Sequence, residues 1–124
     1  MGNPVVHFEL WSPAPEKLSK FYEAAFDWKI QPYPELSYFM TDTDGPEGNK
    51  GINGGLFKPD GGPEGWPGNT ALYIQVPDLA AALVRVVAAG GKVILDRKDV
   101  PGMGAFSLFA DTEGRVVGLW WMPS

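Results

Sequence analysis

Two stretches decide the fold: residues 5–30, which read VVHFELWSPAPEKLSKFYEAAFDWKI, and residues 69–94, which read NTALYIQVPDLAAALVRVVAAGGKVI. Each begins with alternating residues, a period of two that is typical of a strand with two different faces. Each continues with apolar residues at helical spacing, which predicts an amphipathic helix. The two stretches start 64 positions apart (69 − 5), and their apolar positions keep phase through strand, helix and strand. This pattern predicts an internal duplication.

The first repeat predicts the order β-α-β-β-β. Strands are expected at Val5–Trp11, Trp28–Tyr33, Leu36–Thr41 and Gly51–Phe57. The helix between the first two opens at residues 12–15, where Ser12 or Ala14 is placed near the cap and a proline in the first turn. Its buried stripe is predicted to consist of Leu18, Phe21, Tyr22, Ala25 and Phe26.

The second repeat predicts the same order. Strands are expected at Ala71–Val76, Lys92–Leu95, Ala105–Ala110 and Val116–Trp121, with a turn at 111–114 before the last. Asp78 is the expected N-cap of the helix, and Gly90-Gly91 its end. The stripe that this helix buries is predicted to be Leu79, Ala82, Leu83, Val86 and Val87.

The length of 124 residues predicts one domain. It divides into a first module at about 4–57, a linker at 58–69 and a second module at about 70–121. The linker reads KPDGGPEGWPGN, nearly all turn residues, and its Trp66 is either a lid or an anchor that packs the linker down.

Composition excludes several classes of site. The chain has no cysteine and one histidine, His7, which rules out thiolate metal sites, cysteine nucleophiles and single-chain sites that need two histidines. The formal net charge of −5 disfavours nucleic acid and anionic membrane surfaces as partners. No stretch is apolar over the roughly 20 residues of a membrane span, and the N-terminus lacks a signal-peptide pattern. A cytoplasmic location is therefore expected.

Three local motifs add a family resemblance. They occur in this order across nearly the whole chain: Phe21-Tyr22 with 26-FDWK-29, then 88-AAGGKV-93, and last 111-DTEGRVVGLW-120. In order and spacing the sequence resembles the vicinal oxygen chelate superfamily of glyoxalases, bleomycin resistance proteins and extradiol dioxygenases. It is most similar to the single-domain bacterial group related to lactoylglutathione lyase. The resemblance implies an α+β fold, in which two β-α-β-β-β modules form a cupped mixed sheet with helices outside. It also implies a homodimer, which would cover edge strands.

The resemblance places four metal-ligand positions at His7, Gly55, Ala71 and Gly118. Only His7 carries a donor atom, so the expected metal site is none and the expected cofactor is none, with a divalent metal at His7 as the alternative. This departs from the family pattern and argues against its metal-dependent chemistry here.

Strand alternation predicts which side chains face the cup. If Val6, Phe8 and Leu10 meet the helices, then His7, Glu9 and Trp11 face inward. The same rule puts Leu72, Ile74 and Val76, Val117, Leu119 and Trp121, and Ile52 and Leu56 on the helix side. In the strand at 105–110, either Phe106 and Leu108 or Ser107 and Phe109 face the cup. The residues predicted to bind a ligand are Trp11, Asn53, Phe57, Tyr73, Gln75 and Trp120.

Three functions fit this list. The first is a binding protein that holds a small, largely apolar or aromatic molecule in a metal-free cup. The second is an enzyme of the lactoylglutathione lyase and dioxygenase group that uses Glu9 or His7 as catalytic base, or a rearranged metal site. The third is a protein-interaction module whose cup face is buried against a partner.

Overall fold

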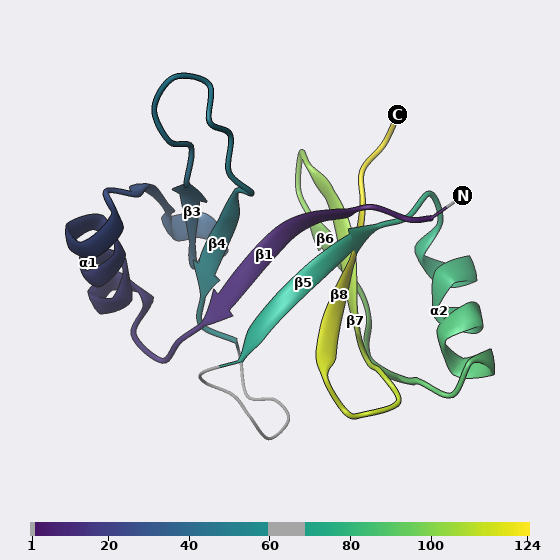
Figure 1. The fold of residues 1–124 in the computed structure, drawn as a ribbon. Helices are drawn as coiled ribbons and strands as arrows, with labels where there is room; N and C mark the ends of the chain where they lie inside the picture. The colour runs from purple at the N-terminus through teal and green to yellow at the C-terminus, as the bar shows by residue number, and fades with distance from the viewer. Residues whose placement is uncertain (1, 60–68) are drawn as a thin grey trace. The chain divides into compact units, whose positions relative to one another are not determined.

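The computed structural model describes residues 2–59 and 69–124, and these form eight strands, two α-helices and a short 3-10 helix (Figure 1). The predicted linker and Trp66 lie mostly or wholly outside the described residues. The β-α-β-β-β order occurs twice, as the repeat predicts. In chain order the elements are β1 Val5–Trp11, α1 Pro15–Phe26, β2 Lys29–Tyr33, the 3-10 helix Pro34–Leu36, β3 Tyr38–Asp42, β4 Gly54–Phe57, β5 Thr70–Gln75, α2 Leu79–Ala88, β6 Lys92–Val100, β7 Gly104–Ala110 and β8 Val116–Trp121.

The chain separates into two compact units. We call His7–Ala71 the α1 unit, and Leu72–Ser124 with the residues up to Val6 the α2 unit. In the α1 unit the strand order is β2-β3-β4-β1, with β1 parallel to β4 and the other pairs antiparallel. In the α2 unit the order is β5-β8-β7-β6, with β5 parallel to β8 and the other pairs antiparallel. The two units therefore repeat one topology.

The α2 unit has the core that the sequence predicts. Asp78 caps α2 by accepting a hydrogen bond of 3.0 Å from the Ala81 amide. The helix packs Leu79, Ala82 and Leu83 against the sheet. From the sheet, Val76, Ala105, Phe109 and Leu119 join this core, with Ile74, Val117 and Trp121 packed against it.

This core decides the alternation of β7 and corrects two expectations. Because Phe109 belongs to the helix side, Phe106 faces the other way. Leu72 and Val87 were expected to meet the core, but they are 49% and 55% exposed. β6 also continues to Val100, beyond the predicted end at Leu95, with two register shifts along its pairing with β7.

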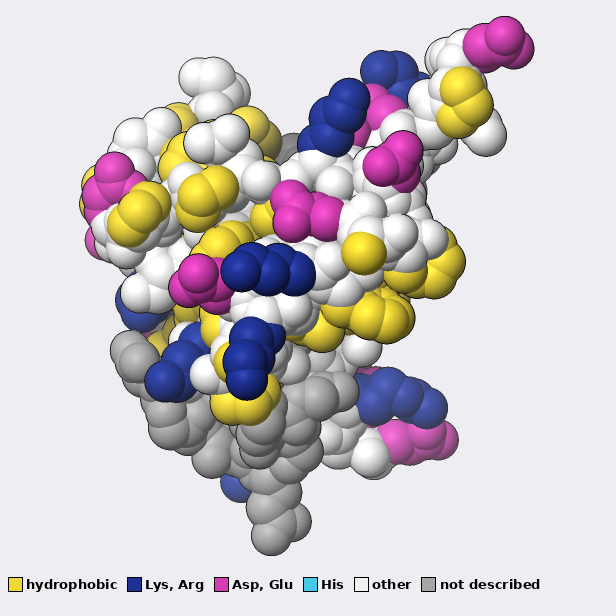
Figure 2. All heavy atoms as spheres, turned by 90° about the vertical axis from the view of Figure 1, so that its left-hand side faces the viewer, with side chains coloured by type: hydrophobic (Ala, Val, Ile, Leu, Met, Phe, Trp, Pro, Cys, Tyr) yellow, Lys and Arg dark blue, Asp and Glu magenta, His cyan; other side chains and the backbone are white. Residues whose placement is uncertain are grey.

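The predicted buried stripe of α1 is only partly right: Leu18 and Tyr22 are half-buried, and Ala25 is exposed. Phe21 is 56% exposed and Phe26 is 62% exposed. At 100° per residue Phe21 lies about 60° to one side of Leu18, away from the buried Ser19, whereas Phe26 points in the direction of the strip but is the last residue of the helix. Instead the rings pack on one another, and Tyr22 stacks on Trp28 with centroids 4.5 Å apart. Figure 2, which views the α1 side, shows hydrophobic side chains exposed among charged ones.

The strand predicted at Gly51–Phe57 begins only at Gly54. The preceding residues form a loop held by Thr43, whose hydroxyl donates to the Ile52 carbonyl (2.7 Å) and whose amide donates to Asn53 Oδ1 (3.2 Å). Ile52 is 60% exposed rather than packed under the helix. Asn53 is exposed too, so the strand alternation that placed it in the cup does not apply to it. The strand predicted at Leu36–Thr41 likewise starts two residues later, because the 3-10 helix takes up Leu36.

Candidate functional site

The α1 unit carries its polar candidates on the sheet face away from α1. The ring of Phe8 contacts that of Trp28, just beyond α1, with centroids 5.8 Å apart, and Leu10 lies beside α1 residues. Alternation along β1 therefore sends His7 and Glu9 to the opposite face, as predicted. We call this surface the histidine face; it consists of His7, Glu9, Tyr38, Gly55 and Phe57.

His7 is held by a tyrosine that the sequence analysis did not select. Its Nε2 lies 2.7 Å from the Tyr38 hydroxyl oxygen, and the two rings stack at 21°. Burial lowers the pKa of His7 below its ordinary value of 6.5. The imidazole is therefore neutral at pH 7, and Nε2 accepts a hydrogen bond from the phenol when the ring proton is on Nδ1.

Glu9 and Trp11 form a second pair on β1. The Trp11 indole Nε1 donates a hydrogen bond of 2.7 Å to Glu9 Oε1. Glu9 is 5% exposed and Trp11 is 2% exposed. The carboxylate is thus a buried and oriented acceptor, and the indole is a structural partner for it rather than an open wall.

The family ligand position Gly55 is covered by the same tyrosine. A Cβ added at Gly55 would run into the outer end of the Tyr38 ring. Tyr38 pairs with Phe57, whereas the partner of Gly55 on β3 is Met40, two residues further along. The Tyr38 ring therefore reaches diagonally across β4 toward His7. The space that a ligating side chain would occupy at position 55 is filled by the phenol.

The α2 unit repeats this arrangement. Tyr73 and Gly118 are direct partners in the pairing of β5 with β8, and a Cβ at Gly118 would run into the Tyr73 ring. Phe106 packs edge-on against Tyr73, with centroids 6.2 Å apart. Trp120, which pairs with Phe106 across the strands, is half-buried. We call Tyr73, Phe106 and Trp120 the aromatic wall of the α2 unit; strand alternation predicts two of its three members.

The residues present do not fit the metal site of the resembling family. Position 71 is a fully buried alanine, and positions 55 and 118 are glycines covered by tyrosine rings. In the part of the chain that the structure describes, no three His, Cys, Asp or Glu side chains come close enough to share an ion. We therefore derive no chemistry through a metal.

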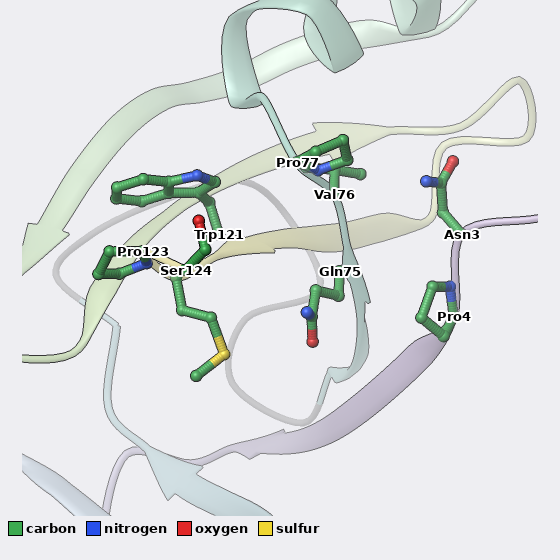
Figure 3. A pocket seen from close by; sticks show the side chains of 9 residues that line it. Asn3, Pro4, Gln75, Val76, Pro77, Trp121, Pro123 and Ser124 are labelled. Atoms are coloured by element: carbon green, nitrogen blue, oxygen red, sulfur yellow. The ribbon is translucent and has the colours of Figure 1, made fainter.

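Gln75 lies in a cavity of about 460 Å³ in the α2 unit (Figure 3). Pro4, Pro77 and Trp121 also line it, and the Arg97 guanidinium lies 5.3 Å from the centre of the Trp121 ring. Sequence reasoning placed Trp121 on the helix side correctly but missed this cavity.

Comparison with known proteins gives the family. Residues 6–119 match the glyoxalase-like domain family. A Mycobacterium tuberculosis protein named "Putative glyoxylase CFP32" is 32% identical over 105 residues, which are 82% of this chain and 39% of the relative. The anthracycline biosynthesis protein DnrV of Streptomyces peucetius is 34% identical over 64 residues, 52% of this chain and 23% of that protein. The chain thus spans about two-fifths or less of these relatives.

Solved structures share the fold. The hypothetical protein BH1468 of Bacillus halodurans superposes over 100% of this chain and 97% of its own, with a TM-score of 0.66 and 13% identity. Streptomyces coelicolor methylmalonyl-CoA epimerase, in complex with 2-nitronate-propionyl-CoA, superposes over 100% of both chains with a TM-score of 0.65 and 13% identity. These likenesses confirm the predicted α+β class.

Proposed function

Because the chain belongs to the glyoxalase-like domain family, we propose that it is a metal-independent member that binds a small, planar, largely aromatic molecule. The aromatic wall of the α2 unit and Phe57 on the histidine face supply ring surfaces. Gln75, His7 and Tyr38 supply the few polar groups that orient a ligand. The Trp11 and Asn53 contacts predicted from sequence have less support, since one side chain is buried and the other lies in a loop.

The observation that carries the proposal is the position of Tyr38. Its ring fills the space above Gly55, and its hydroxyl engages Nε2 of the chain's single histidine. A metal bound at Nε2 of His7 would have to break that hydrogen bond, and a metal at either ring nitrogen would find no second ligand at position 55. In the α2 unit Tyr73 covers Gly118 in the same way, which supports the absence of metal ligands at both glycine positions.

Two further facts support an aromatic ligand. The half-buried rings of Phe106 and Trp120 leave surface on which flat apolar molecules can stack, and the buried Tyr73 packs against Phe106. The relative DnrV is named for the biosynthesis of anthracyclines, which contain a planar aromatic ring system.

The test is calorimetric titration of the metal-stripped protein with a panel of hydroxyanthraquinones, naphthoquinones and aromatic acids. We expect at least one to bind, unchanged by EDTA, and Trp120→Ala to weaken it about threefold to tenfold, the loss of one stacked contact. Trp28→Phe is the matched control, because Trp28 lies on the α1 side. Binding that requires added zinc, nickel, iron or manganese would overturn the proposal.

A second candidate function is metal-free proton transfer. A neutral histidine hydrogen-bonded to a phenol is a competent acid–base pair. Incubation in D₂O with methylmalonyl-CoA and with the glutathione hemithioacetal of methylglyoxal, followed by NMR, would reveal exchange of the acidic C–H. Exchange that His7→Gln abolishes would assign the role, and no exchange in any substrate would leave the binding function alone.

The homodimer expected from the family resemblance is also part of the proposal. The exposed rings of Phe21 and Phe26 are apolar surface that pairing can cover. Light scattering should give about twice the chain mass of 13.5 kDa.

Neither described helix is long and apolar enough to cross a bilayer. The predicted cytoplasmic location remains a prediction.

A further inference from the structure

A second cavity, of about 390 Å³, lies wholly within the α1 unit, where the end of β1 meets α1. Its apolar walls are Leu10 from β1 and Leu18 and Tyr22 from α1. Pro13, in the segment that connects β1 to α1, also lines it. Tyr22 is fixed in place by its stacking on Trp28. This volume lies in the range of small-molecule sites. Leu10, Leu18 and Tyr22 place the cavity on the helix side of β1, and Trp11, whose indole donates to Glu9 of the histidine face, also lines it.

One polar group in this cavity lacks a partner. Asn69 lines the cavity, and its side-chain nitrogen Nδ2 is buried without a hydrogen-bond partner among the described residues. The rest of Asn69 is anchored, because its carbonyl accepts a hydrogen bond of 2.9 Å from the Trp11 amide. A buried amide donor with no acceptor is costly and uncommon in native proteins. Such a donor beside this cavity points to a ligand that brings the acceptor, which Nδ2 reaches when the Asn69 side chain turns toward the cavity.

We propose that this cavity is a second ligand site, which takes a small aromatic or alicyclic ketone. The apolar part of the ligand lies against Leu10, Leu18 and Tyr22, and its carbonyl oxygen accepts a hydrogen bond from Asn69 Nδ2. A ketone fits better than a carboxylate, because the described lining residues of this cavity include no cation to pair with an anion. The site uses no residue of the aromatic wall and none of the residues that define the histidine face; Trp11, which also lines it, donates to Glu9 of that face and is left unchanged in the test.

The test uses two probes of nearly equal size, acetophenone, which has a carbonyl, and ethylbenzene, which does not. Binding is followed by ¹H–¹⁵N NMR of the full chain, with the Asn69 side-chain amide as the local signal. We expect acetophenone to shift that signal and to bind about fivefold more tightly than ethylbenzene, the factor typical of one net hydrogen bond. Asn69→Leu should remove the preference while ethylbenzene still binds.

Two further variants keep the result interpretable. Leu18→Phe narrows the cavity and should weaken both probes, with retention of the native amide spectrum showing that the chain is folded. Trp120→Ala, which tests the proposed function in the α2 unit, should leave both affinities unchanged. Equal binding of both probes to wild type, or a preference that survives Asn69→Leu, would overturn the proposal. So would the absence of any shift in the Asn69 signal at millimolar acetophenone.

Discussion

The two modules share a glycine covered by a tyrosine, but they differ in how much apolar surface their helices bury. In both, a tyrosine ring covers a glycine at a position where the resembling family places a metal ligand. The α2 unit backs its sheet with a helix that buries Leu79, Ala82 and Leu83. The α1 helix buries only Ser19 and leaves two phenylalanines exposed. The difference indicates that α2 contributes more apolar burial to its unit than α1 does, and that α1 leaves apolar surface exposed.

The largest expected effect tests that contrast in packing. Leu83→Ala should lower the free energy of unfolding by about 2–5 kcal/mol, because it deletes a buried side chain from the α2 core. Phe26→Ala in α1 should cost less than about 1 kcal/mol, since its ring is 62% exposed and contacts only the neighbouring rings of Phe21, Tyr22 and Trp28. Urea denaturation of the two variants measures both values. Equal losses would break the comparison.

The next effect tests the covered glycines. Gly118→Ala should cost about 1–3 kcal/mol, because the new methyl group meets the middle of the Tyr73 ring in a fully paired register. Gly55→Ala should cost less, because it meets only the outer end of the Tyr38 ring, which can turn away. In a Tyr73→Ala background the Gly118→Ala penalty should largely vanish. A penalty that persists there would mean that something other than the tyrosine requires glycine.

Much of this architecture is predictable from sequence, and the errors are local. The duplication, both helices and the face of β1 follow from periodicity, which depends on backbone geometry alone. The prediction that Phe21 and Phe26 are buried was wrong, because spacing gives the direction of a side chain around a helix but not how wide or how long a strip of the helix the sheet covers. The prediction that Asn53 faces the cup was wrong, because Thr43, ten residues earlier, holds Ile52 and Asn53 in a loop and β4 begins only at Gly54.

The covered glycines show a different limit. Sequence identifies Gly55 and Gly118 as positions without donor atoms, yet it does not reveal what fills them. Tyr38 reaches Gly55 from a neighbouring strand and a diagonal register, information that exists only once β3 and β4 pair. Tyr73 was selected by alternation as a ligand contact, and its 5% exposure shows that most of the ring serves packing.

A third prediction isolates the hydrogen bond between Tyr38 and His7 in the α1 unit. Tyr38→Phe removes the hydroxyl that lies 2.7 Å from His7 Nε2 and keeps the ring over Gly55. We expect a loss of about 0.5–1.5 kcal/mol in the free energy of unfolding. Tyr73→Phe is the matched change in the α2 unit. Chemical denaturation compares the two with wild type, and a loss at Tyr38 beyond about 3 kcal/mol would show that the ring itself had moved.

The smallest effect is on pH dependence and also belongs to the α1 unit. Burial holds the pKa of folded His7 below the 6.5 of the unfolded chain. Between these two values the unfolded chain binds a proton that the folded chain does not, so acid favours unfolding. The contribution of His7 is therefore fully present above about pH 6.5 and is lost as pH falls through the folded pKa.

His7 is the only histidine, so urea midpoints between about pH 5 and 7 report mainly on this group. We expect wild-type stability to fall across that window and His7→Gln to flatten the fall. Titration of the His7 ring by NMR checks the cause directly, and a pKa above 6.5 in the folded protein would contradict the burial that we assign to it.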